Sequence, residues 1–139
     1  MIALLLALQT LPPAPEALLP GAIGRQALPA KGCAAYLWSR GPTPVLVAMA
    51  VADPASARLA IGGTAKDFAR VTASGGEAGF GFAKLTEYRL GDVTATIDLT
   101  IATRPDLTGG GVVTDATLTV MRGGGDTLVV PIGGLIGCR

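Results

Sequence analysis

The chain has 139 residues, of which 50% are hydrophobic and 15% charged, with 11 basic side chains, 10 acidic side chains and no histidine. This length fits a single domain, and a formal net charge of +1 excludes the strongly basic surface that nucleic-acid binding requires. The absence of histidine removes the commonest general base and the commonest imidazole metal ligand. We therefore expect no metal, no other cofactor and no nucleic-acid partner.

Residues 1–10 contain an unbroken apolar run from Ile2 to Leu8. The run is too short to cross a bilayer, which takes about 20 apolar residues, but it is typical of the apolar region of a secretory signal peptide. The alternative is an apolar N-terminus on a cytoplasmic protein, because no Lys or Arg precedes the run and the cleavage pattern is indistinct. We predict export to the bacterial periplasm or cell envelope, without a transmembrane segment.

Residues 11–32 hold five of the ten prolines. Proline fixes φ and lacks an N–H donor, so this density excludes a long helix or a central strand. We predict a spacer with local polyproline II character, followed by a single β domain over residues 33–139.

The two cysteines, Cys33 and Cys138, lie at the two ends of this predicted domain. There is no CxxC motif, so neither a metal site nor a redox motif is indicated. The simplest interpretation is one disulfide that joins the first and last strands, which would also favour export. The alternative is a pair of buried free thiols that behave as small apolar side chains.

Strands are predicted where apolar and polar residues alternate with a period of two. The clearest is 93–103, where Val93, Ala95, Ile97 and Leu99 share one face and threonines dominate the other. Further strands are predicted at 33–39, 45–51, 58–61, 66–71, 80–90, 112–122 and 128–132. About eight short strands predict an all-β fold, a small antiparallel β-sandwich or β-barrel without a substantial helix, and the sequence does not choose between the two.

Two segments suggest where their strands lie in the sheet. Residues 44–52 are apolar on both faces of the predicted strand, which indicates a covered, central strand. Pro131 cannot donate to a ladder, which indicates that its strand is an edge at that point.

No constellation of catalytic residues stands out. A Ser–His–Asp triad is impossible without histidine, and no pair of acidic residues is singled out for glycoside hydrolysis. We expect a non-enzymatic binding or envelope-associated accessory module, whose partner is a protein or an envelope component. The high apolar content leaves self-assembly as a further option.

Lys84 conflicts with the predicted pattern. A regular hairpin around Gly91 and Asp92 places Lys84 opposite Leu99 on the apolar face, where an unpaired ammonium is very costly. Three alternatives would resolve the conflict. A β-bulge directs the Lys84 side chain away from the apolar face, or the side chain extends to the rim of the sheet, or it lines an internal cavity and binds an anionic ligand. In the last case Tyr88 and Glu87 are further ligand-facing candidates, and the protein is a small-ligand carrier or a small enzyme.

Two longer loops are predicted at 72–79 and 104–111. Loops on rigid β scaffolds often carry binding residues, which makes Ser74, Glu77, Arg104 and Asp106 candidates. The alternative for each loop is a plain turn.

The general form of the chain resembles small secreted β domains of bacteria, such as lysozyme inhibitors of the MliC type, and Ser74–Gly75 resembles their Ser-Gly motif. The following residues, 76–78, depart from the family pattern, and the later Lys-Gly motif is missing. The resemblance therefore implies a secreted β domain and supplies no site residue.

Overall fold

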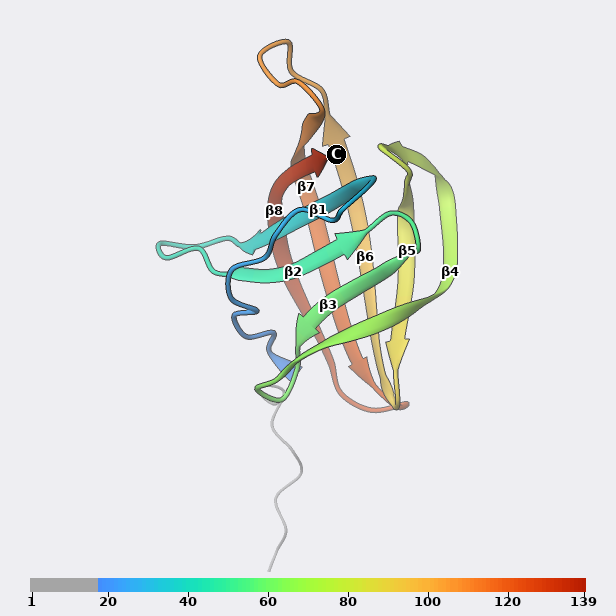
Figure 1. Ribbon diagram of the computed structural model, residues 1–139. Helices are drawn as coiled ribbons and strands as arrows, with labels where there is room; N and C mark the ends of the chain where they lie inside the picture. Colours follow the sequence, from blue (N-terminus) through green and yellow to red (C-terminus); the bar gives the residue numbers. More distant parts are fainter. Residues whose placement is uncertain (1–17) are drawn as a thin grey trace, which may run out of the picture.

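The computed structural model describes residues 18–139, so the apolar run at 2–8 lies outside the described residues. Eight antiparallel strands follow one another along the chain and close into a barrel in which each strand pairs with the next and β8 pairs with β1 (Figure 1). The strands are β1 (Cys33–Ser39), β2 (Leu46–Val51), β3 (Ser56–Ala60), β4 (Ala65–Gly79), β5 (Phe82–Leu90), β6 (Val93–Ala102), β7 (Gly110–Arg122) and β8 (Thr127–Cys138). The all-β prediction is confirmed, and of its two alternatives the barrel is the observed one.

The interior of the barrel is packed with apolar side chains. Val93, Ala95, Ile97 and Leu99 of β6 are all buried, as their alternation predicts. An eight-stranded barrel is just wide enough for inward side chains to fill it. The largest fully buried members of the interior cluster are Leu18, which precedes the strands, and six residues from five strands: Leu37, Leu59, Ile97, Leu118, Val120 and Ile132.

The predicted loop at 72–79 is wrong, because these residues belong to the long strand β4. Ser74 pairs with Leu85, and Glu77 pairs with Ala83. Gly75 and Gly76 lie between these pairs with φ values of 79° and 80°, a conformation that glycine adopts without strain. The two glycines absorb the extra residues as an irregularity in the ladder, so the strand continues past a sequence that is typical of a loop.

Residues 18–32, which we name the N-terminal strap, begin at Leu18, which is buried in the interior cluster, and then run across the outer face of β1, β2 and β3 (Figure 1). The strap has no helix or regular strand, but Ile23 is buried against Ala34, Met49 and Ala60 of the barrel. β2 is therefore covered on both faces, as its apolar sequence predicts. The predicted boundary between a spacer and a domain at residue 33 stays a prediction, and the described part of the spacer is packed on the barrel.

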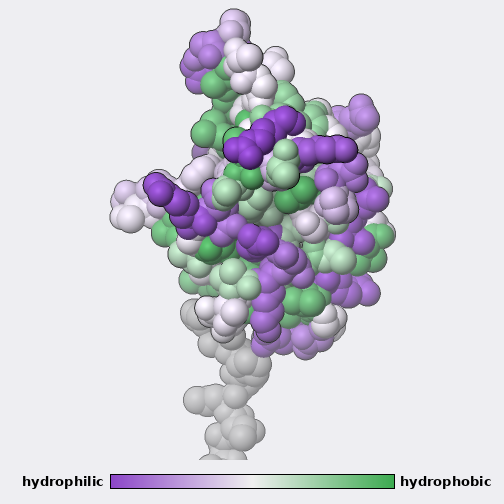
Figure 2. Space-filling model, in the orientation of Figure 1, coloured by the Kyte–Doolittle hydropathy of each residue, from purple (hydrophilic) through white to green (hydrophobic). Residues whose placement is uncertain are grey.

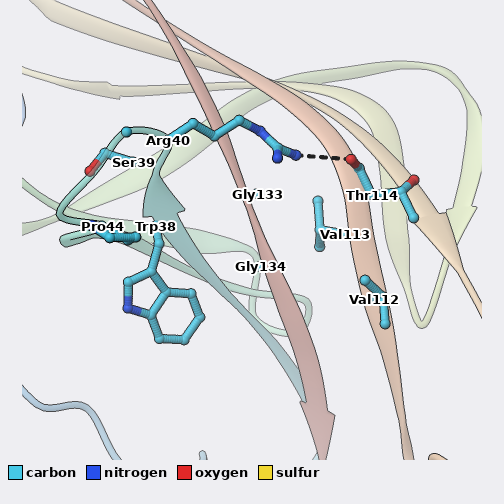
Figure 3. Close-up of a pocket in the computed structure, with 10 residues that line it drawn as sticks. Trp38, Ser39, Arg40, Pro44, Val112, Val113, Thr114, Gly133 and Gly134 are labelled. Carbon is cyan, nitrogen blue, oxygen red and sulfur yellow. Dashed lines mark hydrogen bonds between the residues drawn. The ribbon is translucent and has the colours of Figure 1, made fainter.

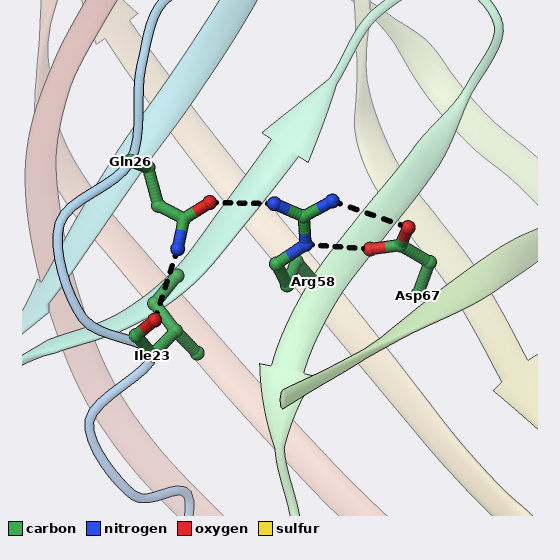
Figure 4. Close-up of polar contacts among 4 residues, drawn as sticks. All are labelled: Ile23, Gln26, Arg58 and Asp67. Atoms are coloured by element: carbon green, nitrogen blue, oxygen red, sulfur yellow. Dashed lines mark hydrogen bonds and ion pairs between the residues drawn. The ribbon is translucent and has the colours of Figure 1, made fainter. Parts of the chain in front are cut away.

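Arg58 and Gln26 connect the strap to the barrel through side chains (Figure 4). Arg58 Nη1 donates to Gln26 Oε1 over 2.6 Å, and Gln26 Nε2 donates to the carbonyl of Ile23 over 2.9 Å. Arg58 also forms two hydrogen bonds to the carboxylate of Asp67 on β4, at 2.8 and 3.2 Å. The hydrogen bonds between the two side chains are the main reason that the pKa of Arg58 is raised and the pKa of Asp67 is lowered.

A disulfide between Cys33 and Cys138, which lie 105 positions apart in the sequence, closes the seam between β1 and β8 and confirms the predicted bridge. Just beyond it, the backbones of Gly32 and Arg139 exchange hydrogen bonds of 3.1 and 2.9 Å. The first and last described strands are thus joined both by the ladder and covalently.

The face of the molecule seen in Figure 2 mixes small groups of hydrophilic and hydrophobic residues. Within residues 18–139, no helix has the length and apolar character needed to span a membrane.

Candidate functional site

An open groove crosses the outer surface where β1, β7 and β8 lie side by side (Figure 3). We name it the Trp38 groove. It has a volume of about 530 Å³ and is lined by Trp38, Ser39, Arg40, Gly41, Pro44, Val112, Val113, Thr114, Gly133 and Gly134. Trp38 is the single tryptophan of the chain.

Two adjacent glycines of β8 form a floor without side chains. A Cβ atom on Gly134 would lie 1.8 Å from the carbonyl oxygen of Tyr36, so no other residue fits without moving the backbone. A Cβ atom on Gly133 would lie 2.5 Å from the guanidinium of Arg40. The glycines therefore permit the close approach of β1 to β8 and let Arg40 lie flat over the strand.

Arg40 stabilises an irregular point in β7. Both ladders of β7 skip Thr114: β6 pairs with Val113 and then Asp115, and β8 pairs with Val113 and then Ala116. Thr114 therefore belongs to neither ladder, and Arg40 Nη2 donates to its carbonyl over 2.9 Å. Arg40 Nε donates to the carbonyl of Ile132 over 3.2 Å. These two bonds hold the guanidinium across the groove, and Figure 3 shows the one to Thr114.

The groove has the shape and charge to hold a small ligand. Trp38 on β1 and the side chains of β7 flank the glycine floor, and the spacing of neighbouring strands puts them roughly 10 Å apart. Arg40 takes part in none of the five ion pairs found among residues 18–139. Two of its five N–H groups are used on backbone carbonyls, so further donors remain for an anion. The lining residues include no acidic side chain.

Lys84 lies with the polar residues of β6, and not in the core as the regular hairpin predicted. The register from Leu90↔Val93 to Leu85↔Asp98 is as predicted. The ladder ends at Leu85, so Lys84 lies just beyond it and is not paired with Leu99. Its ammonium donates to the carboxylate of Asp98 and, over 3.4 Å, to Thr100 Oγ1, with 43% of the side chain exposed. The ion pair removes the conflict of an unpaired buried charge.

The two neighbours of Lys84 in the prediction face different surroundings. Tyr88 is buried in the barrel with 3% of its surface exposed, and this burial raises the pKa of its phenol. Glu87 faces outward and accepts a hydrogen bond from Thr72 Oγ1 over 3.1 Å. A ligand-facing role for Lys84, Tyr88 or Glu87 stays a prediction.

The four predicted loop residues divide between a strand and a loop. Ser74 and Glu77 lie on β4, paired with β5. Arg104 and Asp106 lie in the loop between β6 and β7, which projects at the top of Figure 1, and their side chains form two hydrogen bonds of 3.0 and 3.1 Å. A binding role for any of them stays a prediction.

Sequence reasoning missed the Trp38 groove. The available signal was the pair Gly133–Gly134 next to a β pattern, because glycine inside a strand often marks a close approach of another backbone. The long stretch between Arg40 and these glycines concealed their contact. Among residues 18–139, no cluster of three or more cysteine and carboxylate side chains could hold a metal ion.

Comparisons of the chain with protein-family models, with curated proteins and with solved structures found no match.

Proposed function

We propose that this protein is an exported binding module and that its ligand lies in the Trp38 groove. The observation that carries the proposal is Arg40: its guanidinium is fixed over a bare glycine floor, it has no carboxylate partner among the described residues, and it lies next to the only tryptophan. A fixed guanidinium favours planar anions such as carboxylates. The neighbouring indole favours a flat, partly apolar body.

The ligand class is therefore a carboxylate attached to a flat, partly apolar group. This chemistry occurs in the terminus of a protein partner and in acidic components of a cell envelope. The packed interior of the barrel supports a surface site over the alternative of an internal carrier cavity near Lys84. Export is supported by the disulfide, since disulfides persist in oxidising compartments.

Trp38 allows a direct test, since its fluorescence reports on the groove alone. We would titrate the protein with benzoate, galacturonate and a peptide with a free C-terminal carboxylate, each beside its neutral amide. At least one carboxylate is expected to change the emission saturably, with a dissociation constant of about 1 mM for so small a probe. Its amide is expected to bind at least about tenfold more weakly.

Variants assign the effect to Arg40. Arg40→Gln is expected to abolish the preference for the carboxylate, whereas Arg104→Gln, in the β6–β7 loop and outside the groove lining, is expected to retain it. Equal binding of carboxylate and amide, or full binding by Arg40→Gln, would contradict the proposed site.

A further inference from the structure

The first five residues of β8 have a strand partner on one side only. The ladder between β7 and β8 extends to Met121↔Thr127, but the ladder between β1 and β8 ends at Ser39↔Ile132. There the chain leaves the barrel wall for the projecting hairpin of residues 40–45 (Figure 1). Within residues 18–139, the β1 side of Thr127–Pro131 is therefore a free strand edge. Pro131 at its upper end lacks an N–H, in agreement with the predicted edge position.

An apolar groove lies along this free edge. It has a volume of about 430 Å³ and is lined by Leu19, Pro20, Gly21, Ala22, Ser39, Val45, Val47 and Val130. No lining residue is charged. Large apolar side chains are exposed around it: Val129 is 60% exposed, Leu19 56% and Val45 36%. We name this surface the β8-edge groove.

From this combination we infer that the β8-edge groove binds an extended, uncharged peptide segment of a partner protein by strand addition. The segment pairs with the backbone of Thr127–Val130 and continues the line of β1 beyond Ser39. Main-chain hydrogen bonds to a free edge provide affinity in this mode, and every second side chain of the added strand enters a pocket beside it. The apolar lining of the groove supplies that pocket.

The shape and charge of the groove favour a single extended chain as its occupant. The N-terminal strap borders one side and the 40–45 hairpin projects beside it, so a thin segment has access where the convex wall of a second barrel would meet the hairpin. A charged segment would lose its hydration against neutral residues without gaining a partner. This inference concerns a different surface from the Trp38 groove and does not depend on the function proposed there.

The test is amide hydrogen exchange on the full chain, with a capped peptide of alternating valine and threonine as the probe. Saturating peptide is expected to slow exchange by at least about tenfold at those amides of Thr127–Val130 that point away from β7, which belong to alternate residues. Two further peptides carry N-methyl groups on the odd or on the even amides. Because only alternate N–H groups of a strand face the ladder, one of these peptides is expected to bind and the other to fail.

A matched pair of variants locates the pocket. Val45→Arg places a charge in the groove and is expected to weaken peptide binding at least about tenfold. Val71→Arg makes the same change at a residue on β4 that is 47% exposed, and is expected to leave binding unchanged.

Three results would overturn the inference. The first is exchange at the edge-facing amides of Thr127–Val130 that the peptide does not slow, or equal binding of both N-methylated peptides. The second is a dimer in sedimentation whose formation protects these amides, which would assign the edge to a second copy. The third is slow exchange of these amides before any peptide is added, if the double variant Leu4→Glu with Leu6→Glu abolishes it. That result would assign the edge to the chain's own N-terminus.

Discussion

Gly134 marks the point at which β8 passes closest to the backbone of β1. A methyl group there would meet the carbonyl oxygen of Tyr36 at 1.8 Å, and a backbone atom cannot move aside as a flexible side chain can. We predict that Gly134→Ala lowers the free energy of unfolding by about 3 kcal/mol. Urea unfolding measures this change.

The control for this prediction is Gly124→Ala in the β7–β8 turn. No atom lies within 4 Å of the added methyl group there. Its effect is expected to stay within about 0.5 kcal/mol. Equal losses of unfolding free energy in the two variants would show that the contact with Tyr36 is not the cause of the destabilisation.

Tyr88 links stability to alkaline pH. Burial raises the pKa of its phenol in the folded state above the ordinary value of 10.0. Below that pH the phenol is protonated in both the folded and the unfolded state, and Tyr88 makes its full contribution to stability. As the pH rises further, the unfolded state releases its proton first, so stability falls until the pH passes the folded pKa.

We predict that Tyr88→Phe loses less stability than the unchanged protein between about pH 8 and about pH 11. Urea midpoints across this range provide the measurement. Burial also raises the pKa of Tyr36, the other tyrosine, but Tyr36 is only partly buried, so Tyr36→Phe should have a smaller effect. Parallel losses in the unchanged protein and in Tyr88→Phe would refute the prediction.

At the scale of residues, the sequence predicts well where the ladder is regular. The pairs Tyr88↔Ala95 and Thr86↔Ile97 follow from the Gly91–Asp92 turn and are present. Lys84 departs from the same rule because the β5–β6 ladder ends at Leu85, and its contact with Asp98 depends on the path of the strand beyond that point. Alternation carries no information about where a ladder ends.

Among the elements, the N-terminal strap is held by two backbone hydrogen bonds, from Gly21 to Ala60 and from Ile23 to Leu46, and by a few side-chain contacts. Gln26 is held between Arg58 and the carbonyl of Ile23. We predict that Gln26→Ala loosens the strap and increases the rate of tryptic cleavage after Arg25 by about tenfold, because the hydrogen bond from a charged donor is lost. Mass spectrometry of the early fragments identifies the site.

Asp106→Asn serves as the control, since it breaks the Arg104 contact in the β6–β7 loop and leaves the strap intact. It should leave cleavage after Arg25 unchanged. If Gln26→Ala had no effect either, the burial of Ile23 and the backbone hydrogen bonds from Gly21 to Ala60 and from Ile23 to Leu46 would be sufficient to hold the strap in place.

The limits of strands β4 and β8 show what sequence patterns miss. Gly75–Gly76 in β4 and Gly133–Gly134 in β8 are typical of loops when read alone. In the structure the first pair accommodates an irregular ladder, and the second permits β1 to approach. Both roles depend on the neighbouring strand, which the local sequence does not contain. The Trp38 groove was missed for this reason.

For the molecule as a whole, alternation and turn signals predicted the number of strands and their antiparallel order. Whether such strands form a sandwich or a barrel depends on how the first and last strands meet. The seven pairs from Cys33↔Cys138 to Ser39↔Ile132 close the barrel. The positions of the cysteines were the one sequence feature that indicated this contact.

The disulfide constrains nearly the whole barrel. We predict that the double variant Cys33→Ser with Cys138→Ser loses about 2–4 kcal/mol of unfolding free energy, since a loop of 105 residues is released in the unfolded chain. Reductant should destabilise the unchanged protein equally and leave the double variant unaffected. Two titratable thiols in the denatured, unreduced protein would rule out the bridge.

The claim that the Trp38 groove holds a ligand is tested most directly by NMR. The most tightly bound carboxylate from the fluorescence titration is added to labelled protein, and the amide and indole signals are followed. The account predicts saturable shifts confined to the indole N–H of Trp38 and the amides near Arg40, Gly133 and Gly134. Saturable shifts centred elsewhere, for example on the β6–β7 loop or around Lys84, would contradict it.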